Sequence, residues 1–315
     1  MRVLVTGGAG FIGSYVVDRL IAHGVVPLIY DHHRSPVHPD VEYFNGSILD
    51  MEALRLAMNG IHAVIHLAAV ADVKDVFEDP SYAETVNTRG TLCVLEAARR
   101  CKVSRVVYGG TTWVYSDCAE PEVDEETPIP PPSHLYTATK LASEHYCRAY
   151  SKLYNLPTTL LRFGIPYGPR ARDGAVIPIF VERALKGLPL ALQGDGLQFR
   201  QFVYVEDLAE GVVLSLKPAA ENRVYNLDGG EKISIRQIAE TVRDLLGTPV
   251  EIISTPTRPG DFSGRKVNSA RAEKELGWKA STSFREGVAR YIAWNRSRQE
   301  QRQQSWSKVD AALRS

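Results

Sequence analysis

Short apolar runs alternate with longer amphipathic stretches through the first half of the chain. This alternation is typical of repeated βα units, which build a parallel sheet. The apolar runs predict strands near residues 2–6, 26–31, 41–45, 62–68, 104–110 and 158–163. Apolar residues at helical spacing predict helices near residues 11–23, 50–58, 81–101 and 134–154. We therefore expect an α/β fold with a doubly wound parallel sheet.

The pattern loosens after about Gly168. It predicts helices and extended segments near residues 175–187, 199–205, 206–216, 223–227 and 234–246. We expect residues 1–168 to form the sheet domain, with some core strands returning later in the chain. Residues 169–295 should form mainly a smaller, mixed α/β lobe that binds the substrate. Residues 296–315 are rich in Gln, Arg and Ser, which predicts a polar tail that is a frayed helix or disordered.

The amino-acid composition excludes several classes of function. The 37 basic and 37 acidic residues balance, so no global field attracts nucleic acid or an anionic membrane. The four cysteines show no CxxC spacing, so we expect neither a disulfide framework nor a metal site. Only Met1 and Arg2 precede the first apolar run, and no window approaches about 18 apolar residues. We expect a cytoplasmic protein.

A glycine-rich segment, Thr6–Gly13, lies between the first predicted strand and the first predicted helix. In that context glycines allow a tight turn, a close approach of backbone to a pyrophosphate, and close packing of helix on strand. The helix N-terminus then receives the negative charge. The segment predicts a dinucleotide site of the Rossmann type. The residues expected at the cofactor are Gly7, Gly10, Phe11, Ile12 and Gly13.

An acid closes the second predicted strand. Asp31 follows the glycine segment at about the spacing of a carboxylate that accepts from ribose hydroxyls. It would repel a 2′-phosphate, so NAD is favoured over NADP, although Arg34 could moderate this preference. The neighbouring His32 and His38 lie in a loop with two prolines and no partnering acid at helical spacing. We therefore predict a solvated loop there and no metal.

Seven segments resemble the extended short-chain dehydrogenase/reductase family, specifically its nucleotide-diphosphate-sugar epimerases and dehydratases. They span about residues 2–294 and are Thr6–Gly13, His66–Ala69, Val86–Thr91, Thr111–Tyr115, Tyr136–Lys140, Arg200–Val205 and Arg258–Asp261. The resemblance implies bound NAD, a nucleotide-diphosphate sugar as substrate, with a UDP-sugar favoured, and a homodimer formed through the helices near 81–101 and 134–154. The further cofactor contacts that it implies are His32, Arg34, Ser47, Ile48, Leu67, Ala68, Ala69 and Asn87.

The pair Tyr136 and Lys140 is expected to carry the chemistry. Positions i and i+4 share one face of a helix, and this helix follows a strand that ends in Thr111 and Thr112. A phenol has a reference pKa of about 10, which a cationic Lys140 and a positive nicotinamide can lower. The resemblance implies that Tyr136 takes a sugar hydroxyl proton while Thr111 orients the oxygen. Lys140 would also hold the nicotinamide ribose.

The residues after Thr111 bear on the reaction. Related 4,6-dehydratases place an acidic pair there to eliminate water, whereas this chain has Thr112 and Trp113. Without an acid for the leaving hydroxyl, epimerisation at C4 through a transient 4-keto sugar is favoured. A reductase or dehydratase of a deoxysugar pathway remains the alternative. A non-catalytic NAD-binding scaffold is disfavoured, because the catalytic residues are present.

Substrate choice stays open at this level. Arg200 and Arg258 match arginines that clamp a diphosphate in the family, and bidentate pairing explains that use. Two positions depart from the family, which often has Asp at Ser47 and Asn at Ile165. Arg172 could meet the carboxylate of a hexuronate, so a UDP-hexose and a UDP-hexuronate are equally open. The residues expected to line the substrate are Thr111, Thr112, Trp113, Tyr136, Arg172, Val176, Arg200 and Arg258.

Overall fold

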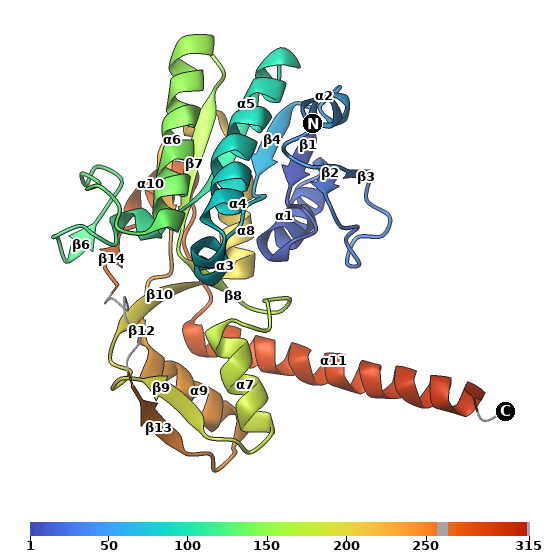
Figure 1. The fold of residues 1–315 in the computed structure, drawn as a ribbon, viewed down its shortest axis with the longest axis vertical. Helices are drawn as coiled ribbons and strands as arrows, with labels where there is room; N and C mark the ends of the chain where they lie inside the picture. Colours follow the sequence, from blue (N-terminus) through green and yellow to red (C-terminus); the bar gives the residue numbers. More distant parts are fainter. Residues whose placement is uncertain (257–263, 314–315) are drawn as a thin grey trace.

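A seven-stranded parallel sheet forms the centre of the larger part of the molecule (Figure 1). The computed structural model describes residues 1–256 and 264–313. The strand order is β11-β7-β5-β4-β1-β2-β3. These strands are β1 (Arg2–Thr6), β2 (Val26–Asp31), β3 (Tyr43–Asn45), β4 (Ala63–His66), β5 (Arg105–Thr111), β7 (Thr158–Phe163) and β11 (Val224–Leu227). From β1 the chain first adds β2 and β3 on one side of the sheet and then returns to add β4 on the other side of β1. This reversal makes a crevice at the carboxyl ends of β1 and β4. The predicted doubly wound sheet is confirmed.

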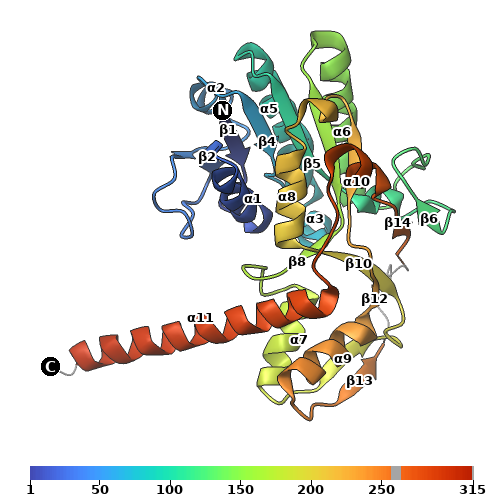
Figure 2. The ribbon, with the colours of Figure 1, turned by 180° about the vertical axis from the view of Figure 1, so that it is seen from behind.

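Helices cover both faces of this sheet (Figures 1 and 2). On one face lie α1 (Phe11–Ala22), α8 (Val205–Leu214) and α10 (Ala270–Leu276). On the other lie α2 (Met51–Ala57), α5 (Gly90–Arg100) and α6 (Leu135–Tyr154). Strands buried on both faces need apolar side chains at nearly every position, which explains the continuous apolar runs in the sequence.

The smaller lobe has its own core. Its sheet has the order β12-β10-β8, made of β8 (Ile165–Tyr167), β10 (Phe199–Tyr204) and β12 (Lys232–Ser234). Beside it lie the pair β9 (Leu190–Gln193) and β13 (Ile252–Thr255), with helices α7 (Val176–Leu185) and α9 (Ile235–Leu246). Helix α9 begins at a capping box in which the side chains of Ser234 and Gln237 each accept a backbone N–H. The lobe's core gathers around Tyr167, packed against Phe202 and Phe284.

The structure corrects the predicted helix at 81–101. It consists of α4 (Pro80–Glu84), a π-helical turn η1 (Thr85–Arg89) and α5, in one continuous run. A π-turn inserts a residue into the helix, and such turns gather at functional sites. Several short elements escaped the sequence pattern, because each has too few residues to show a period. They are β6 (Glu122–Val123), β8, β9, β12, β13, β14 (Lys266–Val267), α3 (Val73–Glu78), α10 and the 3₁₀ turns η2 (Thr112–Tyr115) and η3 (Pro218–Ala220).

Two features beyond residue 168 bear on the expected layout. Strand β11 is a core strand that returns to the large sheet, and helices α8 and α10 pack on the same sheet. Helix α11 (Phe284–Leu313) runs without a break through the predicted polar tail and projects away from both parts of the molecule (Figures 1 and 2). Within the described residues, no helix combines the length and apolar character needed to cross a bilayer.

Candidate active site

The glycine-rich segment has the backbone that a dinucleotide requires. Gly7 adopts a φ of +71°, and a Cβ there would lie 2.8 Å from the backbone nitrogen of Ala68. At Gly13 a Cβ would lie 2.1 Å from the carbonyl oxygen of Gly7. Helix α1 begins at Gly10, which has no side chain to cap the N–H groups of the first turn. These groups are directed to the crevice beside Phe11 and Ile12, so the segment fits a pyrophosphate.

Asp31 ends β2 beside this segment. One of its oxygens accepts from the Ala9 N–H at 3.0 Å, and the other accepts from the His33 N–H at 3.2 Å. The carboxylate is thus fixed at the rim where a ribose would lie. The neighbours His32 and Arg34 are exposed, and the Arg34 guanidinium donates to the carbonyl of Pro39. Among the described residues, no group of three or more His, Cys, Asp or Glu could hold a metal ion.

The predicted adenine and nicotinamide walls follow β3 and β4. Ile48 is buried, and a Cβ at Gly90 would lie 2.4 Å from its Cδ1, so α5 approaches this wall closely. The Ser47 hydroxyl accepts from the Leu49 N–H. After β4, the predicted cofactor contacts Leu67, Ala68 and Ala69 are half-buried.

A buried chain of hydrogen bonds lies under the crevice, and the sequence analysis assigned it no role. The Thr6 hydroxyl oxygen accepts the N–H groups of Leu67 and Ala68, so its proton is donated to His66 Nδ1 at 2.7 Å. His66 Nε2 then carries a proton and donates to the Thr91 hydroxyl at 3.0 Å, which donates to the Asn87 carbonyl. Burial lowers the pKa of His66 to about 3, so the ring is neutral.

Asn87 extends this network to the catalytic helix. Its Oδ1 accepts from Val70 N at 2.8 Å, and its Nδ2 donates to Val70 O at 3.0 Å and to the Thr139 hydroxyl at 3.1 Å. Ser143 donates to the Asn87 carbonyl at 2.9 Å. The predicted contact of Asn87 with the cofactor stays a prediction. Both polar atoms of its buried amide bind protein, and the residue ties the loop after β4 to α6.

Thr111 and Tyr136 meet at the carboxyl end of β5. The Thr111 hydroxyl accepts from the Trp113 N–H at 3.2 Å, which leaves its own proton to be donated. Burial raises the pKa of Tyr136 to about 12, while hydrogen bonding by the Thr111 side chain and the charge of Arg172 act to lower it. The indole of Trp113 lies edge to face with the phenol, with ring centres 6.5 Å apart.

Lys140 is buried one helical turn beyond Tyr136. Its Nζ donates to the carbonyl of Gly109 at 2.6 Å and lies 4.6 Å from the ring centre of Tyr108. Burial lowers the pKa of Lys140 to about 8, and the nearby Glu144 carboxylate opposes this shift. In this structure, the largest influences that lower the Tyr136 pKa are Thr111 and Arg172, and the expected effect of Lys140 together with a nicotinamide stays a prediction.

A buried ion pair joins α6 to strand β7 of the large sheet. Arg162 on β7 pairs with both carboxylate oxygens of Glu144, at 3.0 and 2.8 Å. Its third donor bonds to the Tyr115 hydroxyl at 2.6 Å, which in turn donates to Asn226 at 3.0 Å. Both charged side chains are only 2% exposed. The pair thereby joins β7, α6, η2 and β11 behind the catalytic residues.

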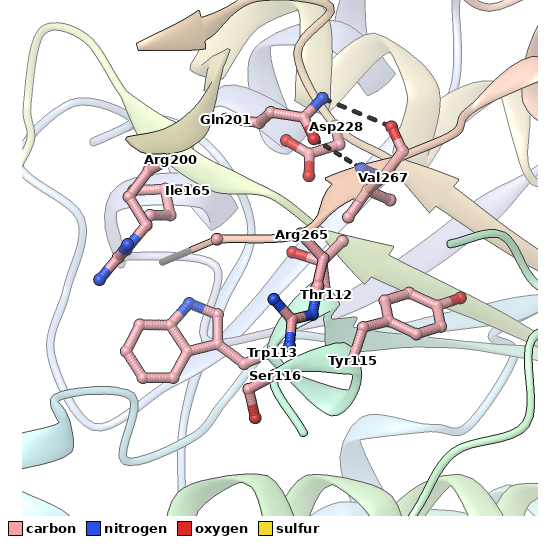
Figure 3. Close-up of a pocket in the computed structure, with 11 residues that line it drawn as sticks. Thr112, Trp113, Tyr115, Ser116, Ile165, Arg200, Gln201, Asp228, Arg265 and Val267 are labelled. Carbon is pink, nitrogen blue, oxygen red and sulfur yellow. Dashed lines mark hydrogen bonds between the residues drawn. The ribbon is translucent and has the colours of Figure 1, made fainter. Parts of the chain in front are cut away.

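A pocket is lined by Trp113, whose indole also contacts the Tyr136 ring (Figure 3). Thr112 and Trp113, the residues after Thr111, form part of its wall. Thr112 donates to the Phe163 carbonyl at 3.2 Å. The other lining residues are Tyr115, Ser116, Ile165, Arg200, Gln201, Asp228, Gly264, Arg265 and Val267. The prediction had named Arg200 among these but had missed Arg265 and Asp228, which lie far apart in the sequence and share no motif.

Three of the other predicted substrate residues have different outcomes. Arg172 forms an ion pair with Asp72 at the start of α3, and its side chain is 57% exposed. In this structure the partner of Arg172 is therefore an acid of the chain, and its predicted contact with a sugar carboxylate stays a prediction. Val176 is the half-buried first residue of α7 and packs against the lobe's core. Arg258 lies outside the described residues.

Known proteins resemble this chain over nearly its whole length. The model of the NAD dependent epimerase/dehydratase family matches residues 3–228, and the chain belongs to this family. It is 34% identical to a UDP-glucose 4-epimerase of Mycolicibacterium smegmatis, over 95% of this chain and 100% of that protein. It is 31% identical to a UDP-glucuronate 4-epimerase of Thermodesulfobacterium geofontis (93% and 95%) and 31% identical to a dTDP-glucose 4,6-dehydratase of Escherichia coli (93% and 92%).

A solved structure agrees with these relatives. The UDP-glucose 4-epimerase of Thermus thermophilus in complex with NAD superposes with a TM-score of 0.86. It is 36% identical, over 94% of this chain and 99% of that one. The protein is therefore an enzyme of an NAD-dependent family whose members include epimerases and dehydratases of nucleotide sugars.

Proposed function

We propose that this protein is an NAD-dependent epimerase that inverts C4 of a nucleotide-diphosphate sugar, a UDP-hexose or a UDP-hexuronate, through a transient 4-keto sugar. The observation that supports it is the Thr111 side chain beside the Tyr136 phenol, whose pKa it lowers, together with Thr112 and Trp113 as the two residues after Thr111. Neither of these two can protonate a leaving hydroxyl, which an elimination of water requires. The pair can still move a proton to and from a sugar hydroxyl, which is what an epimerase needs.

The proposed mechanism uses three side chains. Bound NAD supplies reversible hydride acceptance at C4. Tyr136 takes the proton of the C4 hydroxyl and later returns it, while Thr111 donates its free proton to the same sugar oxygen. Lys140, held at the Gly109 carbonyl, would donate to the nicotinamide ribose and place its charge toward the phenol. The pKa of Tyr136, which burial raises, would be lowered by the positive charge of the oxidised nicotinamide when it is bound.

We assign the cofactor roles by the geometry of the crevice. The N-terminus of α1 with Gly7, Gly10 and Gly13 would take the pyrophosphate, and Asp31 would accept from the adenosine ribose. A 2′-phosphate at that ribose would meet the Asp31 carboxylate, so NAD rather than NADP is proposed. The remaining lining residues are Phe11, Ile12, His32, Arg34, Ser47, Ile48, Leu67, Ala68 and Ala69.

The proposal extends to the substrate's nucleotide and to the assembly. Arg200 lines the pocket and would pair with the diphosphate, together with Arg258. A UDP-sugar is proposed because the two epimerases among the curated relatives named above are a UDP-glucose 4-epimerase and a UDP-glucuronate 4-epimerase. A homodimer through α5 and α6 is also proposed. On α6 the side chains of Leu153 and Tyr154 are exposed.

The test is incubation of the purified protein with UDP-, dTDP- and GDP-sugars, followed by NMR. We expect one UDP-sugar to convert to its C4 epimer without added reductant. A 4-keto-6-deoxy product would identify a dehydratase instead, and consumption of added NADH in equal amounts would identify a reductase. No turnover of any sugar by the NAD-loaded protein would support a binding scaffold.

A further inference from the structure

A buried carboxyl group in the sugar pocket has no role in the mechanism above. Asp228 follows β11, is only 4% exposed, and lines the pocket that also contains Thr112 and Trp113 (Figure 3). One of its oxygens accepts the N–H of Gly229 at 2.8 Å. Within residues 1–256 and 264–313, no cation forms an ion pair with it. Burying a carboxyl group without a cationic partner costs free energy of folding, so this residue calls for a functional explanation.

The Asp228 carboxyl has room at this position because residue 164 is a glycine. A Cβ at Gly164 would lie 1.9 Å from Asp228 Oδ1, so the carboxyl fills the space that a side chain at 164 would use. The next residue, Ile165, presents only carbon to the pocket. Gln201 is engaged elsewhere, since its amide bonds to Gly229 O and to Val267 N, each at 2.6 Å. Of the three side chains Asp228, Ile165 and Gln201, the Asp228 carboxyl is thus the polar group that is left to bind a ligand.

The charged and titratable groups around Asp228 indicate which ligand it can bind. The charged or titratable groups that line the same pocket are Arg200 on β10, Arg265 before β14 and Tyr115 on η2. Two guanidinium groups match the two charges of a diphosphate. Burial raises the pKa of Asp228 to about 8, with only the Gly229 N–H opposing the shift. A sugar hydroxyl can pair with this carboxyl in either protonation state, whereas a sugar carboxylate requires it to stay protonated.

We propose that Asp228 is a sugar-recognition residue that hydrogen-bonds a hydroxyl of the substrate and selects a neutral hexose over a hexuronate. This inference rests on the proposed function, because it takes the pocket beside Thr111 and Tyr136 to be the site of a nucleotide sugar. It narrows the substrate class that the sequence had left open.

The test is calorimetric binding of UDP, UDP-glucose and UDP-glucuronate to the NAD-loaded protein at pH 7 and pH 9. We expect UDP-glucose to bind more tightly than UDP-glucuronate, with the ratio growing about tenfold between the two pH values as Asp228 ionises. In Asp228→Asn this growth should disappear, while the affinity for UDP alone stays unchanged. Asp244→Asn, which removes an exposed carboxylate on α9, should behave as the unchanged protein.

The outcomes separate this inference from the proposed function. Preference for UDP-glucuronate, or a ratio with the same pH dependence in Asp228→Asn, would overturn the inference alone. So would an equal loss of UDP and UDP-glucose affinity in the variant, which would place Asp228 at the nucleotide. Failure of all three ligands to bind would overturn the proposed function as well. Thermal unfolding checks the variant, and Asp228→Ser repeats the measurement if the amide destabilises the fold.

Discussion

The two sides of the crevice are built in different ways. On the cofactor side, one short segment supplies the geometry through its backbone, with Gly7, Gly10 and Gly13 in place of side chains. On the substrate side, the pocket is assembled from side chains of segments far apart in sequence, such as Trp113, Arg200 and Asp228. Backbone geometry accepts only glycine, whereas a pocket of side chains can be altered one residue at a time. This difference is consistent with solved relatives that both bind NAD and yet are named for different reactions, a UDP-glucose 4-epimerase and a dTDP-glucose 4,6-dehydratase.

Tyr136→Phe should reduce turnover more than the other variants, because its phenol would act where the cofactor and the sugar meet. We expect turnover to fall at least about 100-fold, since a positioned base is lost and little else changes. NAD affinity should stay unchanged. Steady-state kinetics and NAD titration measure the two quantities, and Tyr146→Phe on the same helix is the matched control. Near-normal turnover would remove Tyr136 from the mechanism.

Gly13→Ala tests the cofactor side. The added Cβ would lie 2.1 Å from the Gly7 carbonyl, so the loop must move. We expect NAD affinity to fall at least about tenfold, with the same loss of kcat/KM for every sugar substrate. Gly174→Ala is the control, since a Cβ there meets no atom within 4 Å. A loss that differs between sugars would break the proposed separation of the two sides.

Arg172→Ala tests the substrate side at its mouth. Because Arg172 pairs with Asp72 in an exposed position, we expect a loss in kcat/KM of only about two- to fivefold, equal for a UDP-hexose and a UDP-hexuronate. Asp72→Asn should cause a similar loss. Kinetics on both sugars with both variants would decide this. A selective loss for the hexuronate would mean that Arg172 leaves Asp72 to bind the sugar carboxylate.

His66→Gln tests the network beneath the cofactor side, and its effect is on stability. The pKa of His66 is lowered in the folded protein from 6.5 to about 3, so the unfolded chain binds the proton more readily. The contribution of the neutral ring is therefore complete above pH 6.5 and is lost as the pH falls toward 3. Thermal unfolding across this range should show a shallower pH dependence in His66→Gln. The exposed His145→Gln is the control, and equal slopes in all three proteins would contradict the assignment.

The sequence predicted one side of the crevice better than the other, for physical reasons. The strand, glycines and helix of Thr6–Gly13 are contiguous, so their spacing alone defines the local geometry. Asp228 and Arg265 enter the pocket only after β11 and β14 have folded against distant strands. The hydrogen bonds of Asn87 to Val70 and Thr139 could not be predicted, because these residues become its neighbours only in the folded chain. Contacts of this kind have no periodic signal.

The buried pair of Arg162 and Glu144 limits how this protein can change during evolution. Loss of either partner alone strands a charge in the interior, at a cost of about 3–5 kcal/mol. A typical domain has a stability of only about 5–15 kcal/mol, so such a single step removes much of it. A tolerated change at this place would therefore have to replace both residues together. Among the described residues Asp228 belongs to no ion pair, so a substitution there would leave no charged partner buried and alone.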